Sequence, residues 1–129
     1  MRFAKWVFWI AGIYGLLVVT PLFFSEARMG NDFPPPVNHP EWYYGFAGAA
    51  LSWQIMYLLI AGDPVRYRTI MLLGAAAKAS FLGAMIILYL QQRVVPDMVG
   101  IATPDGVLAA FFVAAWLRTP KARLATPGE

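Results

Sequence analysis

The two ionisable side chains with the most unusual surroundings in this sequence are a lysine and an aspartate. Lys78 interrupts an apolar stretch that has no other charge, and Asp105 follows Pro104 inside another apolar stretch. An ammonium and a carboxylate in such places can form a buried ion pair, or they can mark a ligand or proton site. Polar side chains from the other apolar stretches are candidate neighbours of the pair: Gln54, Tyr14, Tyr57 and Ser52. Together these residues form the candidate ligand-binding site.

Two arginines form a second candidate site. Arg66 and Arg68 flank Tyr67 in the short polar segment between the second and third apolar stretches. Guanidinium groups bind phosphate well, so contact with lipid headgroups is the functional interpretation. Ordinary anchoring at a membrane surface is the simpler interpretation, and we favour it.

Several kinds of chemistry are excluded or disfavoured. The chain has no cysteine, which excludes disulfides and thiolate ligands, and its lone histidine, His39, excludes a two-histidine metal or haem site within one chain. We expect His39 to be a solvated or capping residue. The sequence has no HExxH or GxSxG motif and no glycine-rich phosphate loop. We therefore expect no metal and no cofactor, and an enzyme is the less favoured class.

Composition indicates that a membrane surrounds these side chains. Of the 129 residues, 60% are hydrophobic and 13% are charged, whereas about a quarter are charged in soluble domains. A membrane-spanning helix needs about 20 predominantly apolar residues. Four apolar stretches qualify, at about 3–24, 42–61, 69–90 and 96–117, and they predict helices at about 3–24, 41–61, 64–91 and 96–118. The sequence thus predicts an all-α integral membrane four-helix bundle in one domain over 1–119, followed by a polar cytoplasmic tail at 120–129.

The first stretch has some features of a signal peptide, including basic residues before it and a small-x-small pattern at Ser25–Ala27. Its apolar part is longer than the 7–15 residues usual for a signal core. We therefore expect a retained helix.

Basic residues predict the orientation. Apart from Lys78, only two basic residues, Arg28 and Arg93, fall on one side of the predicted membrane, where Glu26, Asp32 and Glu41 also lie. The other side has seven: Arg2, Lys5, Arg66, Arg68, Arg118, Lys121 and Arg123. Both termini are therefore expected to be cytoplasmic. The net charge is +3, and the lysine and arginine residues lie mostly at the ends of the apolar stretches instead of forming one basic face. We therefore expect them to contact lipid headgroups and not nucleic acid.

Two connecting segments have distinct turn signals. Gly62 can end the second helix in a left-handed cap, and Asp63 and Pro64 suit the first turn of the third, which predicts a tight antiparallel hairpin. The segment 25–40 is expected to be the longest outer loop, stiff and extended at Phe33-Pro34-Pro35-Pro36, before a helix begins near Pro40. Trp42, Tyr43 and Tyr44 follow as an aromatic belt.

Small residues recur three or four apart in three of the predicted helices and favour close helix packing in lipid. These residues are Gly45, Gly48, Ala49 and Ser52, then Gly74, Ala75, Ala79 and Gly83, and finally Gly106, Ala110 and Ala114. They predict one compact bundle.

At about 1.5 Å per residue, Lys78, Gln54, Tyr14 and Asp105 all fall roughly 13–19 Å from the outer face. This estimate requires the fourth helix to begin near Pro96. Thr103-Pro104-Asp105 also resembles a helix start, which would leave Asp105 near the outer surface. A charge near the bilayer centre costs at least ~2.5–3.5 kcal/mol, so an inward-facing Lys78 paired with Asp105 is the favoured arrangement.

The segments His39-Pro40-Glu41-Trp42-Tyr43-Tyr44-Gly45-Phe46 and Asp63-Pro64-Val65-Arg66-Tyr67-Arg68 resemble those of small uncharacterised bacterial four-helix inner-membrane proteins. The similarity extends to Lys78 and to 105–118. The chain is also loosely similar to DoxX-like proteins. This resemblance implies the fold and a bacterial inner (cytoplasmic) membrane, and it implies no activity.

The leading functional hypothesis is a small membrane protein whose inward-facing polar site binds a small or lipid-like ligand. An alternative is an accessory or assembly subunit that binds another membrane protein, with a purely structural ion pair. A membrane enzyme acting on a lipid, with Asp105 and Lys78 as acid and base, is a weaker alternative.

Overall fold

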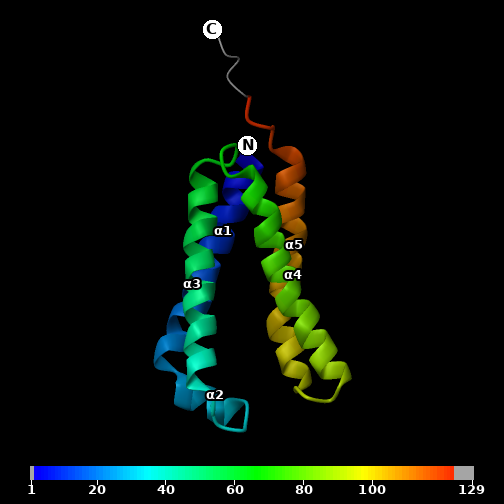
Figure 1. The fold of residues 1–129 in the computed structure, drawn as a ribbon. Helices are drawn as coiled ribbons and strands as arrows, with labels where there is room; N and C mark the ends of the chain where they lie inside the picture. Colours follow the sequence, from blue (N-terminus) through cyan, green and yellow to red (C-terminus); the bar gives the residue numbers. More distant parts are fainter. Residues whose placement is uncertain (1, 124–129) are drawn as a thin grey trace.

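The computed structural model describes residues 2–123, which form helices and connecting segments without a strand. The elements are α1 (Arg2–Val19), the 3₁₀ helix η1 (Thr20–Phe24), α2 (Glu26–Asp32), α3 (Pro40–Gly62), α4 (Arg68–Leu90) and α5 (Pro96–Arg118) (Figure 1). Four helical segments, α1 with η1, α3, α4 and α5, are long and apolar enough to cross a membrane. The prediction of an all-α chain with four such helices is confirmed. Of the predicted tail at 120–129, residues 124–129 lie outside the described part.

The segment after α1 differs from the prediction. The first helix changes from α-helical to 3₁₀ geometry at Thr20–Phe24. Pro21 has no N–H to donate to an α-helical hydrogen bond there. The Ser25 hydroxyl donates to the Pro21 carbonyl at 2.8 Å and helps to close this turn. A short helix, α2, then occupies the first part of the segment that was expected to be a loop. The loop prediction is therefore wrong at 26–32, whereas residues 33–36 lie outside any helix.

The connection between α3 and α4 also needs correction. Gly62 belongs to α3 and does not adopt a positive φ, so the predicted left-handed cap is wrong. Asp63 ends the helix, and its carboxylate accepts the N–H of Arg66 at 3.2 Å. Because a turn follows at 64–67, α4 begins at Arg68 instead of near residue 64. The positive φ, 58°, belongs to Gln92 just after α4.

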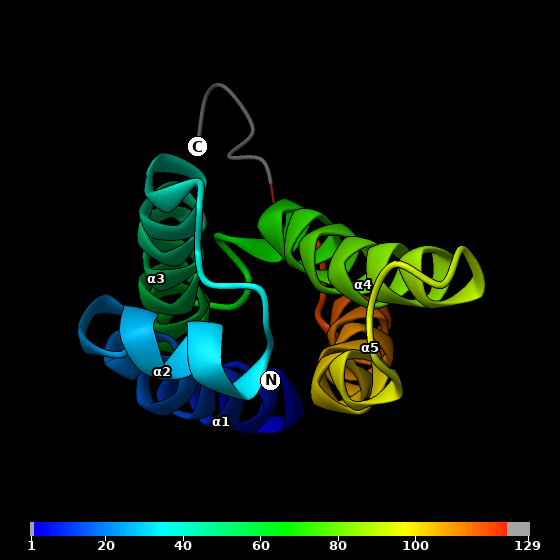
Figure 2. The ribbon, with the colours of Figure 1, turned by 90° about the horizontal axis from the view of Figure 1, so that it is seen from below.

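The four long helices form two antiparallel pairs. α1 packs along α3, and α4 packs along α5, whereas α3 and α4 contact each other much less. The pairs lie close together at the end that contains the N-terminus and the α3–α4 connection, and they diverge towards α2 (Figures 1 and 2). The predicted tight hairpin of α3 and α4 is therefore wrong, and the predicted compact bundle exists at one end only.

The hydrophobic core lies at that closed end. It combines the first half of α1 with the second half of α3, the first half of α4 and the last turns of α5. Phe8 stacks on Phe112 with ring centroids 4.2 Å apart, and Tyr57 meets Phe112 at 4.9 Å. These aromatic contacts join both helix pairs, because they involve α1, α3 and α5.

The small residues follow the prediction only in part. Gly74 packs against Tyr57, and Gly106 packs against Leu82 of the neighbouring helix. Gly45, Gly48 and Gly83 instead face open space, since a Cβ at any of them would meet nothing within 4 Å. The closest glycine packing lies in α1, which the sequence analysis did not single out. A Cβ at Gly12 would lie 2.6 Å from the Leu58 side chain, and Gly15 lies directly against Gln54.

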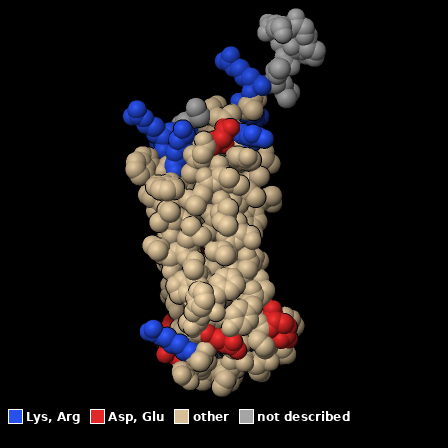
Figure 3. Space-filling model, turned by 90° about the vertical axis from the view of Figure 1, so that its left-hand side faces the viewer, with Lys and Arg blue, Asp and Glu red and all other residues tan. Residues whose placement is uncertain are grey.

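Charges are segregated along the long axis. On the face shown in Figure 3, lysine and arginine gather at the closed end, and most of the acidic side chains lie at the opposite end. A long band without charge separates them, as the lengths of the apolar helices require.

Candidate functional site

An ion pair joins α4 to α5. The Nζ of Lys78 donates to Oδ1 of Asp105 at 2.9 Å. Lys78 is only 6% exposed, while 24% of the Asp105 side chain remains accessible. The pairing is possible because α5 begins at Pro96 and continues through Pro104, which places Asp105 well inside the helix. The predicted pair is thus present in the structure, and the open question of where this helix begins is resolved.

Two further predicted side chains lie beside this pair. The ammonium of Lys78 lies 5.3 Å from the centroid of the Tyr57 ring, which is suitable for a cation–π contact. Gln54 is 5% exposed, and its Nε2 donates to the carbonyl of Ala50 at 2.9 Å. Among residues 2–123, Oε1 of Gln54 has no hydrogen-bond partner. A buried acceptor without a partner is uncommon in folded proteins and is often found at functional sites.

These residues border a cavity of about 470 Å³ between the diverging helix pairs. Its polar lining consists of Tyr14, Tyr43, Gln54, Tyr57, Lys78 and Asp105. Its apolar lining includes Val18, Leu22, Phe46, Trp53, Phe81 and Met98. The cavity therefore combines a large apolar wall with a small polar region that includes an ion pair, a combination typical of small-molecule sites.

Five of the six predicted ligand-site residues border this one cavity, and Ser52 does not. Ser52 is exposed, and its hydroxyl donates to the carbonyl of Gly48 at 3.0 Å. Two residues along a helix correspond to about 200° of rotation, so Ser52 and Gln54 face nearly opposite directions. The inclusion of Ser52 is therefore wrong.

The two predicted headgroup contacts behave differently. Arg68 donates from Nε to the carbonyl of Thr119 at 2.7 Å, and its guanidinium lies 4.4 Å from the centroid of the Trp116 ring. Its interactions are thus largely internal and hold the start of α4 against the end of α5. Arg66 is exposed and lies over its neighbour Tyr67. Contact between Arg66 and a lipid phosphate stays a prediction.

His39 occupies the N-cap position of α3, as a loop or capping residue would. It is exposed, with Nδ1 3.2 Å from the Glu41 carboxylate, and its ring stacks on Trp42. Within residues 2–123, no group of three or more histidine, cysteine, aspartate or glutamate side chains is arranged to hold a metal ion.

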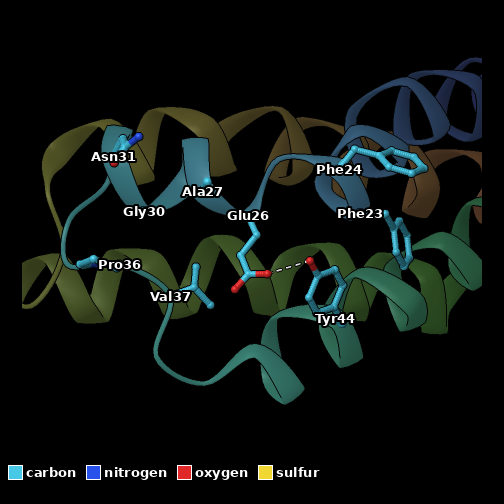
Figure 4. A pocket seen from close by; sticks show the side chains of 9 residues that line it. All are labelled: Phe23, Phe24, Glu26, Ala27, Gly30, Asn31, Pro36, Val37 and Tyr44. Carbon is cyan, nitrogen blue, oxygen red and sulfur yellow. Dashed lines mark hydrogen bonds between the residues drawn. The ribbon is translucent and has the colours of Figure 1, made fainter.

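The sequence analysis missed a second hollow, of about 500 Å³, at the diverging end. Side chains from η1, α2, the segment after α2 and the start of α3 surround it (Figure 4). Glu26 lies in its middle and accepts a hydrogen bond from the Tyr44 hydroxyl at 2.8 Å. The hollow depends on α2, which the proline-rich composition of the segment concealed.

Comparisons of the chain with protein-family models, curated proteins and solved structures found no match. The resemblance to bacterial four-helix membrane proteins therefore stays a prediction. The functional argument rests on the geometry of the chain itself.

Proposed function

We propose that this chain is a small integral membrane protein that binds an amphipathic, lipid-like molecule between its two helix pairs. It crosses the cytoplasmic membrane of a bacterium four times, with both termini in the cytoplasm. The charge segregation supports this orientation, because basic residues concentrate at the closed end where α1 begins and α5 finishes.

The observation that carries the proposal is the 470 Å³ cavity bordered by the Lys78–Asp105 pair. An ion pair that served only to join α4 and α5 would need no hollow beside it. Here the Asp105 carboxylate remains partly accessible, and the amide oxygen of Gln54 has no partner within residues 2–123. A bound molecule with a hydrogen-bonding head would give the Asp105 carboxylate a further partner, whereas Oε1 of Gln54 is buried against Gly15.

The shape of the lining indicates the chemical class of the ligand. Aromatic side chains such as Phe46, Trp53 and Phe81 suit an apolar body. Because Lys78 and Asp105 neutralise each other, the site favours a head that exchanges hydrogen bonds over one with a strong net charge. Alcohols, amides and quinone-like carbonyl groups on apolar molecules have this character.

The experiment compares molecules that co-purify with the full chain in a maltoside detergent, identified by mass spectrometry. Ala77 borders the cavity, whereas Ala76 is exposed on the same helix. Ala77→Phe should fill the cavity and remove most of the co-purifying molecule. Ala76→Phe adds the same side chain outside the cavity and should leave the bound amount unchanged.

Both variants should show the thermal unfolding temperature of the parent within a few degrees. An equal amount of bound molecule in a well-folded Ala77→Phe variant would refute the cavity as the binding site. A parent chain that retains no molecule under mild extraction would contradict the proposal itself.

A second function is favoured by one feature of α3. Gly45 and Gly48 lie on an exposed face with open space beside them, which suits the close approach of another membrane helix. On this hypothesis the chain is an accessory subunit of a larger membrane complex. Gly48→Leu would then release a defined partner during mild purification, whereas Ala77→Phe would not.

A further inference from the structure

The polar groups of the cavity between the helix pairs gather at its inner end, towards the closed end of the molecule. The innermost lining residues of α1, α3 and α5 are Tyr14, Tyr57 and Asp105, and Lys78 is next to the innermost lining position of α4. Most lining side chains beyond them are apolar, and the hydroxyl of Tyr43 already donates to a backbone carbonyl at 2.6 Å. The cavity therefore accommodates an amphipathic molecule with its head beside Lys78 and its apolar body towards the diverging end.

Lys78 brings a primary amine to this inner end. It is buried in the middle of α4, whereas the other two lysines of the sequence, Lys5 and Lys121, are exposed at the start of α1 and after α5. Unlike a guanidinium, an amine can give up a proton and attack a carbonyl carbon. The cavity thus places one nucleophilic nitrogen where the head of a ligand lies.

Asp105 is positioned to exchange protons with this amine. Its Oδ1 lies 2.9 Å from Nζ of Lys78, and the two residues are the only charged ones in the cavity lining within residues 2–123. Acylation of the lysine would remove its charge and leave the carboxylate unpaired in apolar surroundings, which is unfavourable. Imine formation avoids this, because a protonated imine carries the same single positive charge as the ammonium.

We propose that Lys78 binds an apolar aldehyde covalently, as a protonated imine with Asp105 as its counterion. The site is the cavity of the proposed function, on which this assignment of a ligand class rests. The lysine nitrogen forms a bond to the aldehyde carbon, and the carbonyl oxygen leaves as water. Two of the three ammonium protons end on that oxygen, with Asp105 carrying protons between nitrogen and oxygen, and the third stays on the imine. Hydrolysis reverses these steps and releases the aldehyde unchanged.

The test incubates the purified full chain in maltoside micelles with an apolar chromophoric aldehyde, 4-(dimethylamino)cinnamaldehyde. A protonated imine should appear as an absorption band at longer wavelength than that of the free aldehyde. Sodium cyanoborohydride then fixes the imine for peptide mass spectrometry. Because the cavity holds the aldehyde beside the amine, labelling of Lys78 should exceed that of Lys5 or Lys121 at least about tenfold.

Four variants test the roles of the residues. Lys78→Arg keeps a positive charge for Asp105 but has no reactive amine, so it should lose both the adduct and the band. Lys5→Met is the matched control and should keep both. Ala77→Phe fills the cavity and should lose the adduct. Asp105→Asn removes the counterion and should abolish the band of the protonated imine, a readout that a purely structural role would not move.

The thermal unfolding temperature of each variant is compared with that of the parent. If Lys78→Arg does not fold, the double variant Lys78→Met/Asp105→Leu replaces it and should also lose the adduct. A parent without an adduct on Lys78, or equal labelling of all three lysines, overturns the proposal. A band that persists in a folded Lys78→Arg or Asp105→Asn variant, or a full adduct in folded Ala77→Phe, overturns it as well.

The corresponding alcohol, 4-(dimethylamino)cinnamyl alcohol, cannot form an imine and separates this proposal from the proposed function. Its binding is measured by native mass spectrometry. If the alcohol binds the parent and not Ala77→Phe while the aldehyde gives no adduct, the cavity is correct and the imine is wrong. If Ala77→Phe binds the alcohol as well as the parent does, the cavity itself is refuted.

Discussion

At the scale of single side chains, the Lys78–Asp105 pair shows how a charge can lie within apolar helices. Each ion alone would carry a desolvation cost of several kcal/mol, on the order found for buried charges. The 2.9 Å contact offsets part of this cost, and the ring of Tyr57, 5.3 Å from the ammonium, adds a cation–π contribution of about 1 kcal/mol. The pair is therefore a mutually dependent unit.

This dependence predicts the outcome of a double-mutant cycle. Lys78→Met leaves an unpartnered carboxylate, and Asp105→Leu leaves an unpartnered ammonium, so each should lose about 3 kcal/mol of stability in detergent. The double variant should recover most of that loss, because an apolar pair can replace a buried ion pair at little cost. The measurement is the free energy of unfolding of all four proteins, from which the coupling energy follows.

A coupling energy near zero would contradict the contact between the two residues.

The depth of each residue, estimated from its position along its helix, was enough to predict this pair. An ammonium in the middle of an apolar helix needs a polar partner, and Asp105 lies at a similar depth. The same counting failed for Ser52, since depth contains no information about the direction in which a side chain points. The contact between Gln54 and Gly15 was equally hidden, because it depends on how α1 and α3 are rotated about their axes. The sequence predicts how far along a helix a residue lies more reliably than the direction in which its side chain points.

At the scale of elements, the left-handed residue lies in another connection than the one predicted. Gly62, at the end of α3, is helical, while the connection after α4 places Gln92 at φ 58°. Glycine permits a positive φ but does not require one, so composition alone could not locate it. The position of the turn after α3 followed from the sequence, and its backbone conformation did not.

The left-handed residue gives a clear prediction. Gln92→Val should destabilise the protein by about 1–2 kcal/mol, because a β-branched side chain is strained at positive φ. Gln92→Gly should be neutral or stabilising, since glycine accepts this conformation freely. Thermal unfolding in detergent is the measurement. Gly62→Ala serves as the control and should be tolerated, because Gly62 is helical and a Cβ there meets nothing within 4 Å.

Similar behaviour of Gln92→Val and Gln92→Gly would show that the turn after α4 does not hold its positive φ. A large loss of stability in Gly62→Ala would indicate that Gly62 adopts a positive φ, as first predicted.

The four long helices themselves were predictable, because apolar length is a property of each segment on its own. Their pairing was not. The exposed glycines of α3 suggested packing that the structure lacks, and the glycines of α1 provide packing that the pattern did not reveal. Which helices pack together depends on how the surfaces of two helices fit each other. The residue pattern of one helix does not show which other helix it contacts.

At the scale of the whole molecule, the basic and acidic ends determine a testable orientation. The chain has no cysteine, so single cysteines can be introduced without a background. Cysteines at Asn38 and Gln92 lie near the diverging end and should react with an impermeant thiol reagent added to intact cells. A cysteine at Ala122, near the closed end, should react only after the membrane is permeabilised.

Each variant should be compared before and after permeabilisation to show that its cysteine is reactive. Labelling of Ala122→Cys in sealed cells would reverse the proposed orientation. Protection of all three positions in sealed cells would argue against a surface-exposed diverging end.

The division of the molecule into a packed end and an open end has an evolutionary consequence. The aromatic core around Phe8, Tyr57 and Phe112 joins the helix pairs at one end, whereas much of the wall around the cavity lies beyond it. Substitutions at cavity-lining positions of the open half, such as Met98 or Ile101, therefore leave the aromatic core intact. The shape of the cavity can thus change by mutation while the closed end keeps the chain folded.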